Sequence, residues 1–364
     1  MNGHRVTEFT PVLLFTCTIL SVAPDRGTSP LIPPVMWDDL VPQTHAVGFK
    51  VMYVSDESRT WNGEGHAVPR PIRISLWYPA SAHPHAPKML YRQYVHYREE
   101  SASFAGVNAA LEKRNLDSFS RNVQGDEAVQ KLLNMDTAAI LDAMFADGRF
   151  PLVLYASGLN QSWQADNNVL CEYLASAGYV VAAVAGLGAK SIQQDIVPED
   201  LKASVDDAEF ATRGLKNIRQ VDETKLATIG HSMGAVEAVL FAMRNRHVRA
   251  VVGFDGSYGV ASLKRTLTQS DYYVAEMNTP LLDLRRQTDD IDLSATDSFK
   301  SDRFLLQLPG LLHADFTSFP FIALHVPMAV QGRTPETGAR GPSPPLLLSY
   351  PHLMSYEVWR ELPG

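Results

Sequence analysis

Apolar runs alternate with amphipathic stretches through the middle of this sequence. The runs at 151–156 and 179–184 are continuously apolar, which is typical of strands covered on both faces of a sheet, and 248–254 is apolar apart from Arg249. Between them, apolar residues in 169–177 and 201–215 recur at intervals of three and four, which favours helices. This alternation predicts an α/β fold with a doubly wound, mostly parallel sheet.

Further strands are predicted on either side of that central part. Residues 47–54 and 72–78 form an expected opening pair, and the second alternates apolar and polar positions like a half-buried antiparallel strand. After the central part, 279–284 and 304–308 are two more short apolar runs. In such a sheet, functional sites lie at the carboxyl ends of the strands.

Residues 88–148 interrupt the alternation before the strand at 151–156. Their apolar positions have helical spacing, namely Val129, Leu132, Leu133, Ala139, Ile140, Ala143 and Met144. The stretch is long for a connection between strands. It is therefore either a lid over the site or a helical insertion on the scaffold, and we favour a cap-like insertion.

The two ends of the chain differ from the expected domain of residues 46–325. Residues 1–23 combine an early basic pair, a short apolar run and small residues before Pro24, which is typical of a signal peptide. We expect secretion or periplasmic export, or a cytoplasmic protein if this leader is not cleaved. Residues 24–45 are an expected linker, and 326–364 are an expected Pro/Gly-rich tail.

Composition narrows the possible partners. The 364 residues carry a formal net charge of −8, which argues against a nucleic-acid partner. The leader run is too short for an integral membrane span. Only Cys17 and Cys171 are present, so we expect no disulfide framework, and no residue spacing indicates a metal or another cofactor. The pattern contains no signal for an oligomeric state.

The most informative motif is Gly230-His231-Ser232-Met233-Gly234. A short β-branched run precedes it and a small-residue helical pattern follows it, as in the strand–turn–helix of a nucleophile elbow. The turn forces strained backbone angles on the serine, so Gly230 and Gly234 would supply the room that it needs. We interpret Ser232 as a nucleophile and His231 as a packing residue beneath the turn.

A serine nucleophile needs a histidine base. In this class of fold the base follows the acid along the chain. His313 lies just after the last predicted strand, at the expected edge of the sheet. His325 lies in an apolar segment and His352 in the tail, so His313 is the preferred base.

The acid that orients the base has more than one candidate. Asp255 ends the strand that follows the nucleophile helix, and we prefer it. Asp289, after the next strand, is the second choice, and Asp283 lies within a strand and would be buried.

Acyl transfer also needs two backbone N–H groups that face the developing oxyanion. One is expected from Met233, which follows the nucleophile. The other is expected from Leu159, in the loop after the strand at 151–156, where Gly158 lets the backbone turn.

These motifs together resemble the platelet-activating-factor acetylhydrolase and dienelactone-hydrolase-like branch of the α/β-hydrolases. The resemblance extends over 72–319 and rests on residues 76–80, 154–159, 171–179, 230–234, 253–255 and 313–316. It implies an α/β-hydrolase fold and supports Ser232, Asp255 and His313 as a triad, with Leu159 and Met233 as oxyanion donors. It further implies hydrolysis of small-molecule or lipid esters with short acyl groups, without a cofactor.

Three features depart from that resemblance. Dienelactone hydrolases proper use a cysteine nucleophile, so Ser232 does not carry lactone specificity with it. Ser157 stands where the oxyanion loop usually has histidine, and a Pro/Gly-rich tail replaces the expected final helix past Phe321. Ser157 and the tail leave a non-catalytic binding protein with this fold as one alternative. A lipase or polyester hydrolase is another, because the Gly-His-Ser-Met-Gly elbow also occurs there.

Overall fold

A computed structural model describes residues 33–38, 40–63, 65–81, 86–96, 104–161, 164–261, 263–265, 277–288, 292–297 and 299–328. The expected leader and most of the expected tail lie outside these residues. So does the first part of the expected linker.

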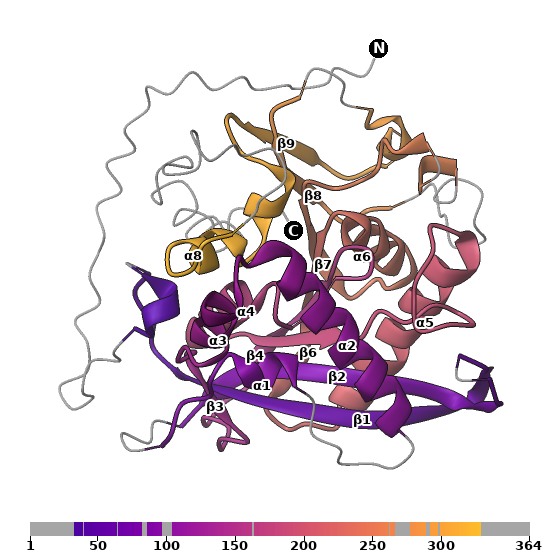
Figure 1. The fold of residues 1–364 in the computed structure, drawn as a ribbon. Coiled ribbons are helices and arrows are strands. Elements are labelled where there is room, and N and C mark those ends of the chain that lie inside the picture. Colours follow the sequence, from indigo (N-terminus) through magenta and orange to yellow (C-terminus); the bar gives the residue numbers. More distant parts are fainter. Residues whose placement is uncertain are drawn as a thin grey trace.

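The described strands form one nine-stranded sheet with the order β3-β1-β2-β5-β4-β6-β7-β8-β9 (Figure 1). The strands are β1 (Ala46–Trp61), β2 (Val68–Ala80), β3 (Ala139–Leu141), β4 (Phe150–Ala156), β5 (Val180–Val184), β6 (Val221–His231), β7 (Val248–Phe254), β8 (Leu281–Arg286) and β9 (Arg303–Leu308). Every strand predicted from the sequence is present.

Strand directions agree with the predicted mostly parallel sheet. β2 is antiparallel to both of its neighbours, β1 and β5, and all other pairs are parallel. Ala156 pairs with Gly230, and Gly230 pairs with Gly253, so β4, β6 and β7 end level with one another. The loops that follow these three strands are therefore brought to one edge.

Helices cover both faces of the sheet. Alternate side chains of each strand therefore point into two separate cores, one on each face. On β4, Val153 belongs to the core beneath α4 (Asn168–Ser176), whereas Leu154 belongs to the core beneath α5 (Pro198–Leu215) and α6 (Met233–Arg244). Pro198 is the first residue of α5, a position where its missing N–H group costs no hydrogen bond. Gly178, which follows the end of α4, has a φ of 96°, a left-handed conformation that favours glycine.

The stretch 88–148 is helical only in part. It contains α1 (Arg92–Val95), α2 (Ala105–Asn122) and α3 (Asp126–Leu133), which lie in front of the sheet in Figure 1. The predicted helical run through Ala139–Met144 is wrong. Ala139–Leu141 is strand β3, which pairs in parallel with residues 47–49 of β1, and the Met144 side chain is 69% exposed. Here backbone pairing with the edge strand β1 prevailed over the helix that the spacing of apolar residues predicted.

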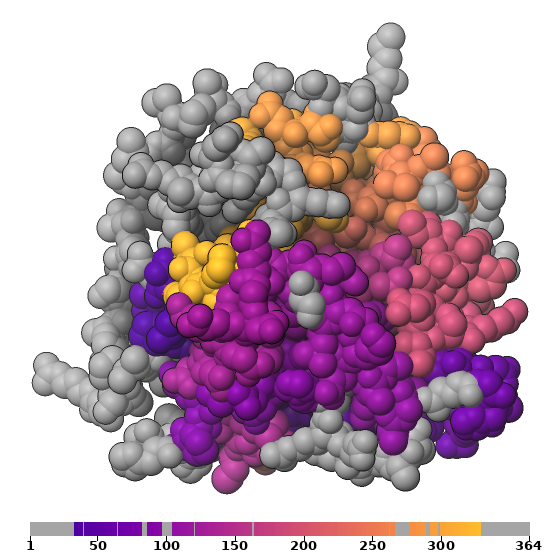
Figure 2. Space-filling view, in the orientation of Figure 1, coloured from indigo at the N-terminus to yellow at the C-terminus, as the bar shows by residue number. Residues whose placement is uncertain are grey.

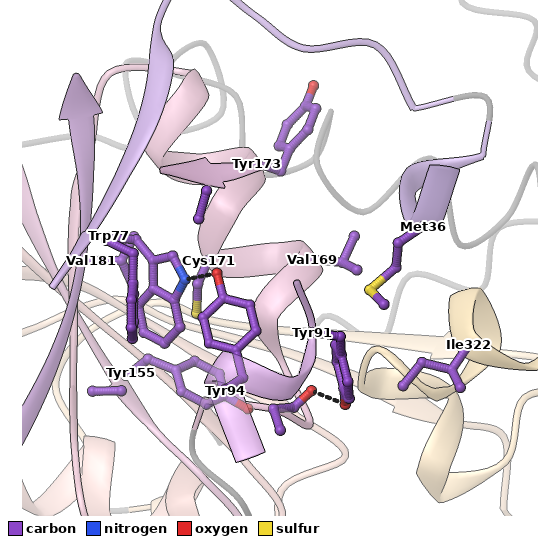
Figure 3. Close-up of a cluster of buried hydrophobic side chains, with 14 of the residues drawn as sticks. Met36, Trp77, Tyr91, Tyr94, Tyr155, Val169, Cys171, Tyr173, Val181 and Ile322 are labelled. Carbon is purple, nitrogen blue, oxygen red and sulfur yellow. Dashed lines mark hydrogen bonds between the residues drawn. The ribbon is translucent and has the colours of Figure 1, made fainter. Parts of the chain in front are cut away.

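A buried cluster joins these helices to the sheet (Figure 3). The Trp77 indole of β2 donates a hydrogen bond to the Tyr94 hydroxyl of α1 at 2.9 Å. Tyr94 in turn donates to the carboxylate of Glu172 in α4 at 2.8 Å. Glu172 also accepts hydrogen bonds from the Trp37 indole at 2.8 Å and the Ala138 amide at 3.0 Å. Burial raises the pKa of Glu172, while these donors counteract the rise.

The insertion also contacts the residues that follow the last described helix, α8 (Phe319–Ala323). Figure 2 shows the two segments side by side on the front surface, in magenta and yellow. The Gln124 amide donates to the Pro327 carbonyl at 2.9 Å, and Lys131 Nζ donates to the His325 carbonyl at 2.8 Å. None of the described helices is long and apolar enough to cross a membrane.

Candidate active site

The expected nucleophile lies at a strained turn between β6 and α6. Ser232 has a φ of 57° and a ψ of −119°, a conformation that costs a non-glycine residue free energy. The turn places the side chain at the carboxyl end of β6, half-buried, as expected for a nucleophile elbow.

The two glycines of the motif are required by close backbone contacts. A Cβ atom on Gly230 would lie 2.1 Å from the Gly234 carbonyl oxygen, and one on Gly234 would lie 2.2 Å from the Ala156 carbonyl oxygen. Side chains at either position would therefore separate α6 from β6 or from β4. This is the steric reason that the sequence predicted.

The structure brings the expected base and acid together. His313 begins a 3₁₀ turn, η4 (His313–Phe316), after β9, and Asp255 directly follows β7. His313 Nδ1 lies 2.5 Å from Asp255 Oδ2. Burial alone would raise the Asp255 pKa, but the hydrogen bond and charge of His313, with the nearby Arg286 and Arg285, lower it below its ordinary value. The carboxyl group is thus held as an anion that can orient the imidazole.

The nucleophile hydroxyl has a different hydrogen-bond partner. Ser232 Oγ lies 3.3 Å from Ser257 Oγ, and within the described residues no hydrogen bond joins Ser232 to His313. Hydrogen bonds of this kind are often long in enzymes without substrate and tighten in the complex. In this structure Asp255 and His313 are therefore in contact, whereas the Ser232 hydroxyl is within hydrogen-bond distance of the Ser257 hydroxyl.

The loop after β4 is fixed by side chains on both of its sides. The Gly158 amide donates to Gln161 Oε1 at 3.0 Å. Asn160, with a φ of 53°, pairs with the backbone of Gln194 through Oδ1 at 2.8 Å and Nδ2 at 2.9 Å. The Leu159 amide makes no hydrogen bond within the described residues, so it is free to donate to a substrate oxygen.

The second expected oxyanion donor is Met233, the first residue of α6. The N–H groups of a helix's first turn have no partner within the helix, so they can bind an anion. Gly234 lies against the carbonyl groups of Ala156 and Ser157, so the start of α6 adjoins the start of the Leu159 loop.

His231 does more than the packing role expected from the sequence. Its imidazole is fully buried, with one nitrogen 3.0 Å from Gln161 Oε1 and the other 3.2 Å from the His313 carbonyl oxygen. Burial and the neighbouring His313 lower its pKa to about 3. The neutral ring carries one N–H, so it donates to one of these oxygens at a time. His231 thus lies between the expected oxyanion loop and the loop of the expected base.

The structure describes two of the four other candidates for acid and base, Asp283 and His325. Asp283 is buried, as expected, and forms an ion pair with Arg285, and burial raises its pKa to about 6. His325 follows α8, and its backbone carbonyl accepts a hydrogen bond from Lys131 Nζ. Asp289 and His352 lie outside the described residues.

Three site residues were missed from the sequence: Asn160, Gln161 and Ser257. Asn160 and Gln161 follow the glycine of the predicted oxyanion loop, and their amide side chains were the available signal. Ser257 follows Asp255 by two residues, but nothing local to it indicates that it reaches Ser232.

Two small cavities lie near the loops of the site, although Ser232, Asp255 and His313 line neither of them. The first has a volume of about 40 Å³ and is bordered by Ser157, Gln194 and Glu237, whose pKa burial raises to about 8. The second, also about 40 Å³, is bordered by Phe254 and Phe316. Each has room for about three water molecules. Within the described residues, no group of three or more His, Cys, Asp and Glu is arranged to hold a metal ion.

Comparisons with known proteins agree with this architecture. Residues 156–292 match the dienelactone hydrolase family, a segment that includes Ser232 and Asp255. A ferulic acid esterase from Streptomyces cinnamoneus has a similar fold, with a TM-score of 0.62 and 20% identity over 88% of this chain and 92% of that chain.

Two other solved structures are more distant. An esterase from Pyrobaculum calidifontis has a TM-score of 0.44 and 15% identity, over 89% of this chain and 88% of that chain. A dienelactone hydrolase from Anabaena variabilis has a TM-score of 0.39 and 13% identity, over 77% and 95%. No curated protein matches the sequence.

Proposed function

We propose that this chain, an α/β-hydrolase of the dienelactone-hydrolase-like branch, cleaves carboxylic esters through an acyl-enzyme formed on Ser232. The family match and the fold support a carboxylic ester hydrolase. To this we add two proposals, the serine mechanism and the class of substrate.

One arrangement carries the proposal. A serine at a strained strand-to-helix turn lies at the same sheet edge as a histidine whose Nδ1 is 2.5 Å from a buried aspartate. An anionic Asp255 holds one imidazole tautomer, with the proton on Nδ1, and leaves Nε2 free to accept a proton. A histidine in this state can serve as a general base for a serine hydroxyl.

The reaction then proceeds in two steps. His313 Nε2 takes the Ser232 hydroxyl proton while Oγ bonds to the ester carbonyl carbon, and the carbonyl oxygen becomes an oxyanion facing the Leu159 and Met233 amides. The alcohol leaves with the proton from His313. Water, deprotonated by His313, attacks the acyl carbon, the bond to Ser232 Oγ breaks as His313 returns that proton to Oγ, and the acid is released.

The resemblance to acetylhydrolases supports esters with short acyl groups. A lipase or polyester hydrolase is the alternative within the same chemistry, because the Gly-His-Ser-Met-Gly elbow also occurs there. A panel of p-nitrophenyl acetate, butyrate and palmitate separates them by acyl length, and methyl ferulate adds an aryl ester. We expect the highest kcat/KM with acetate.

The purified chain and Ser232→Ala test the mechanism. We expect hydrolysis of p-nitrophenyl acetate by the wild type, and loss of at least about a thousandfold in kcat in the variant. A fluorophosphonate should label the wild type at Ser232, mapped by mass spectrometry. A correctly folded wild type that neither hydrolyses the panel nor takes the label would instead be a non-catalytic binding protein.

A further inference from the structure

The loop after β7 contacts both side chains of the proposed reaction. Its first residue, Asp255, meets His313, and its third, Ser257, places its hydroxyl oxygen 3.3 Å from Ser232 Oγ. Asp255 and Ser257 are two residues apart, so one short segment contacts both the base and the nucleophile.

Backbone hydrogen bonds fix that segment against its surroundings. The Asp255 amide donates to the Leu284 carbonyl at 2.7 Å, and the Ser257 amide donates to the Ser232 carbonyl at 3.1 Å. Beneath them, Arg285 Nη2 donates to the Gly256 carbonyl at 3.1 Å. The position of Ser257 relative to Ser232 is therefore set by hydrogen bonds to the backbone of residues 255–257 and does not depend on the Ser257 side chain.

We infer that the Ser257 hydroxyl donates a hydrogen bond to Ser232 Oγ and thereby orients the nucleophile, an inference that rests on the proposed function. Each of the two hydroxyl groups has one proton. In the reaction the Ser232 proton goes to His313, so the Ser232–Ser257 contact must use the Ser257 proton. Ser232 Oγ then accepts from Ser257 while it donates to His313.

The same hydrogen bond acts in both chemical steps. When Ser232 Oγ attacks, the bond from Ser257 holds an Oγ lone pair aligned with the carbonyl carbon. When the acyl-enzyme breaks down, Oγ leaves the acyl carbon with an electron pair until His313 returns the proton. Ser257 stabilises the negative charge on Oγ during that interval.

Three substitutions separate the hydroxyl group from the shape of the residue. Ser257→Thr keeps a hydroxyl, Ser257→Val has the shape of threonine without it, and Ser257→Ala removes it with no added bulk. The measurement is the second-order rate of fluorophosphonate labelling, which reports attack by Ser232 without acyl-enzyme breakdown. The unfolding midpoint of each variant shows whether the fold is retained.

We expect labelling about tenfold slower in Ser257→Val and Ser257→Ala, with Ser257→Thr close to the wild type. For hydrolysis of p-nitrophenyl acetate, kcat should likewise fall in Ser257→Val and Ser257→Ala and stay close to the wild-type value in Ser257→Thr. If valine and alanine label like the wild type, or if threonine is as slow as valine, the inference is wrong. Faster labelling of the alanine variant would also overturn it, because Ser257 would then draw the Ser232 hydroxyl away from His313.

The outcome is distinguishable from failure of the proposed function. If the wild type takes no label at Ser232, both proposals fail. If Ser232 is labelled at equal rates in all variants, only the role of Ser257 is lost.

Discussion

At the scale of single residues, the site depends on side chains that far-apart segments bring into contact. Asp255 is buried and paired with His313, whereas Asp289, the second choice from the sequence, lies outside the described residues. A triad acid acts by fixing the imidazole tautomer, so its amide substitute leaves the shape unchanged while removing the correct tautomer.

Asp255→Asn should therefore reduce kcat by about 10³- to 10⁴-fold. Asp289→Asn is the matched control and should stay near wild-type turnover. The measurement is hydrolysis of p-nitrophenyl acetate by both variants. The reverse result, with Asp289→Asn inactive and Asp255→Asn active, would move the acid to the loop after β8.

His231 gives the fold a dependence on pH. Its pKa in the folded chain is about 3, below the ordinary value of 6.5, so the unfolded chain binds the proton more readily between these values. The stability that this difference contributes is present above pH 6.5 and is lost as the pH falls toward 3. By this linkage the wild type should lose about 2 kcal/mol of unfolding free energy through His231 between pH 7 and pH 5.

His231→Gln should lack that part of the loss, as measured by urea unfolding at the two pH values. His66→Gln, at an exposed histidine, is the control and should lose as much as the wild type. Equal losses in the wild type and His231→Gln would show that His231 does not supply this pH dependence.

At the scale of elements, the elbow depends on how closely α6 approaches β4. Gly234 lies where a Cβ would be 2.2 Å from the Ala156 carbonyl oxygen, directly before the loop that contains the Leu159 amide. Any added side chain must displace either the helix or that loop.

Gly234→Ala should lower the unfolding free energy by about 3 kcal/mol and also reduce kcat, because the two expected oxyanion donors would move apart. Gly214→Ala is the matched control in α5, since a Cβ there meets no atom within 4 Å. It should raise stability by up to about 1 kcal/mol. Chemical denaturation of both variants measures the difference, and equal effects would contradict the steric explanation.

At the scale of the whole molecule, Glu172 connects parts of the chain that the sequence separates widely. Its fully buried carboxylate accepts hydrogen bonds from Trp37 in the segment before the sheet, from Tyr94 in α1, and from Ala138 directly before β3. The insertion and the N-terminal segment therefore share one anchor on α4.

Glu172→Ala should cost about 4 kcal/mol of unfolding free energy, because it leaves buried donors without an acceptor. Glu57→Ala, at an exposed position on β1, is the control and should change stability by less than about 0.5 kcal/mol. Thermal unfolding of both variants makes the comparison. A Glu172→Ala variant as stable as the control would show that this carboxylate is not an anchor.

The sequence by itself determined the elements that depend on local patterns. Apolar runs at 151–156 and 248–254, the second interrupted only by Arg249, became central strands, and Gly230 and Gly234 marked the elbow, because burial periodicity and steric room are local properties. Only the tertiary structure decided that residues 139–141 pair with the edge of β1 and that Ser232 faces Ser257. Those contacts depend on strand order and register, which bring distant segments together and leave no periodic trace in the sequence.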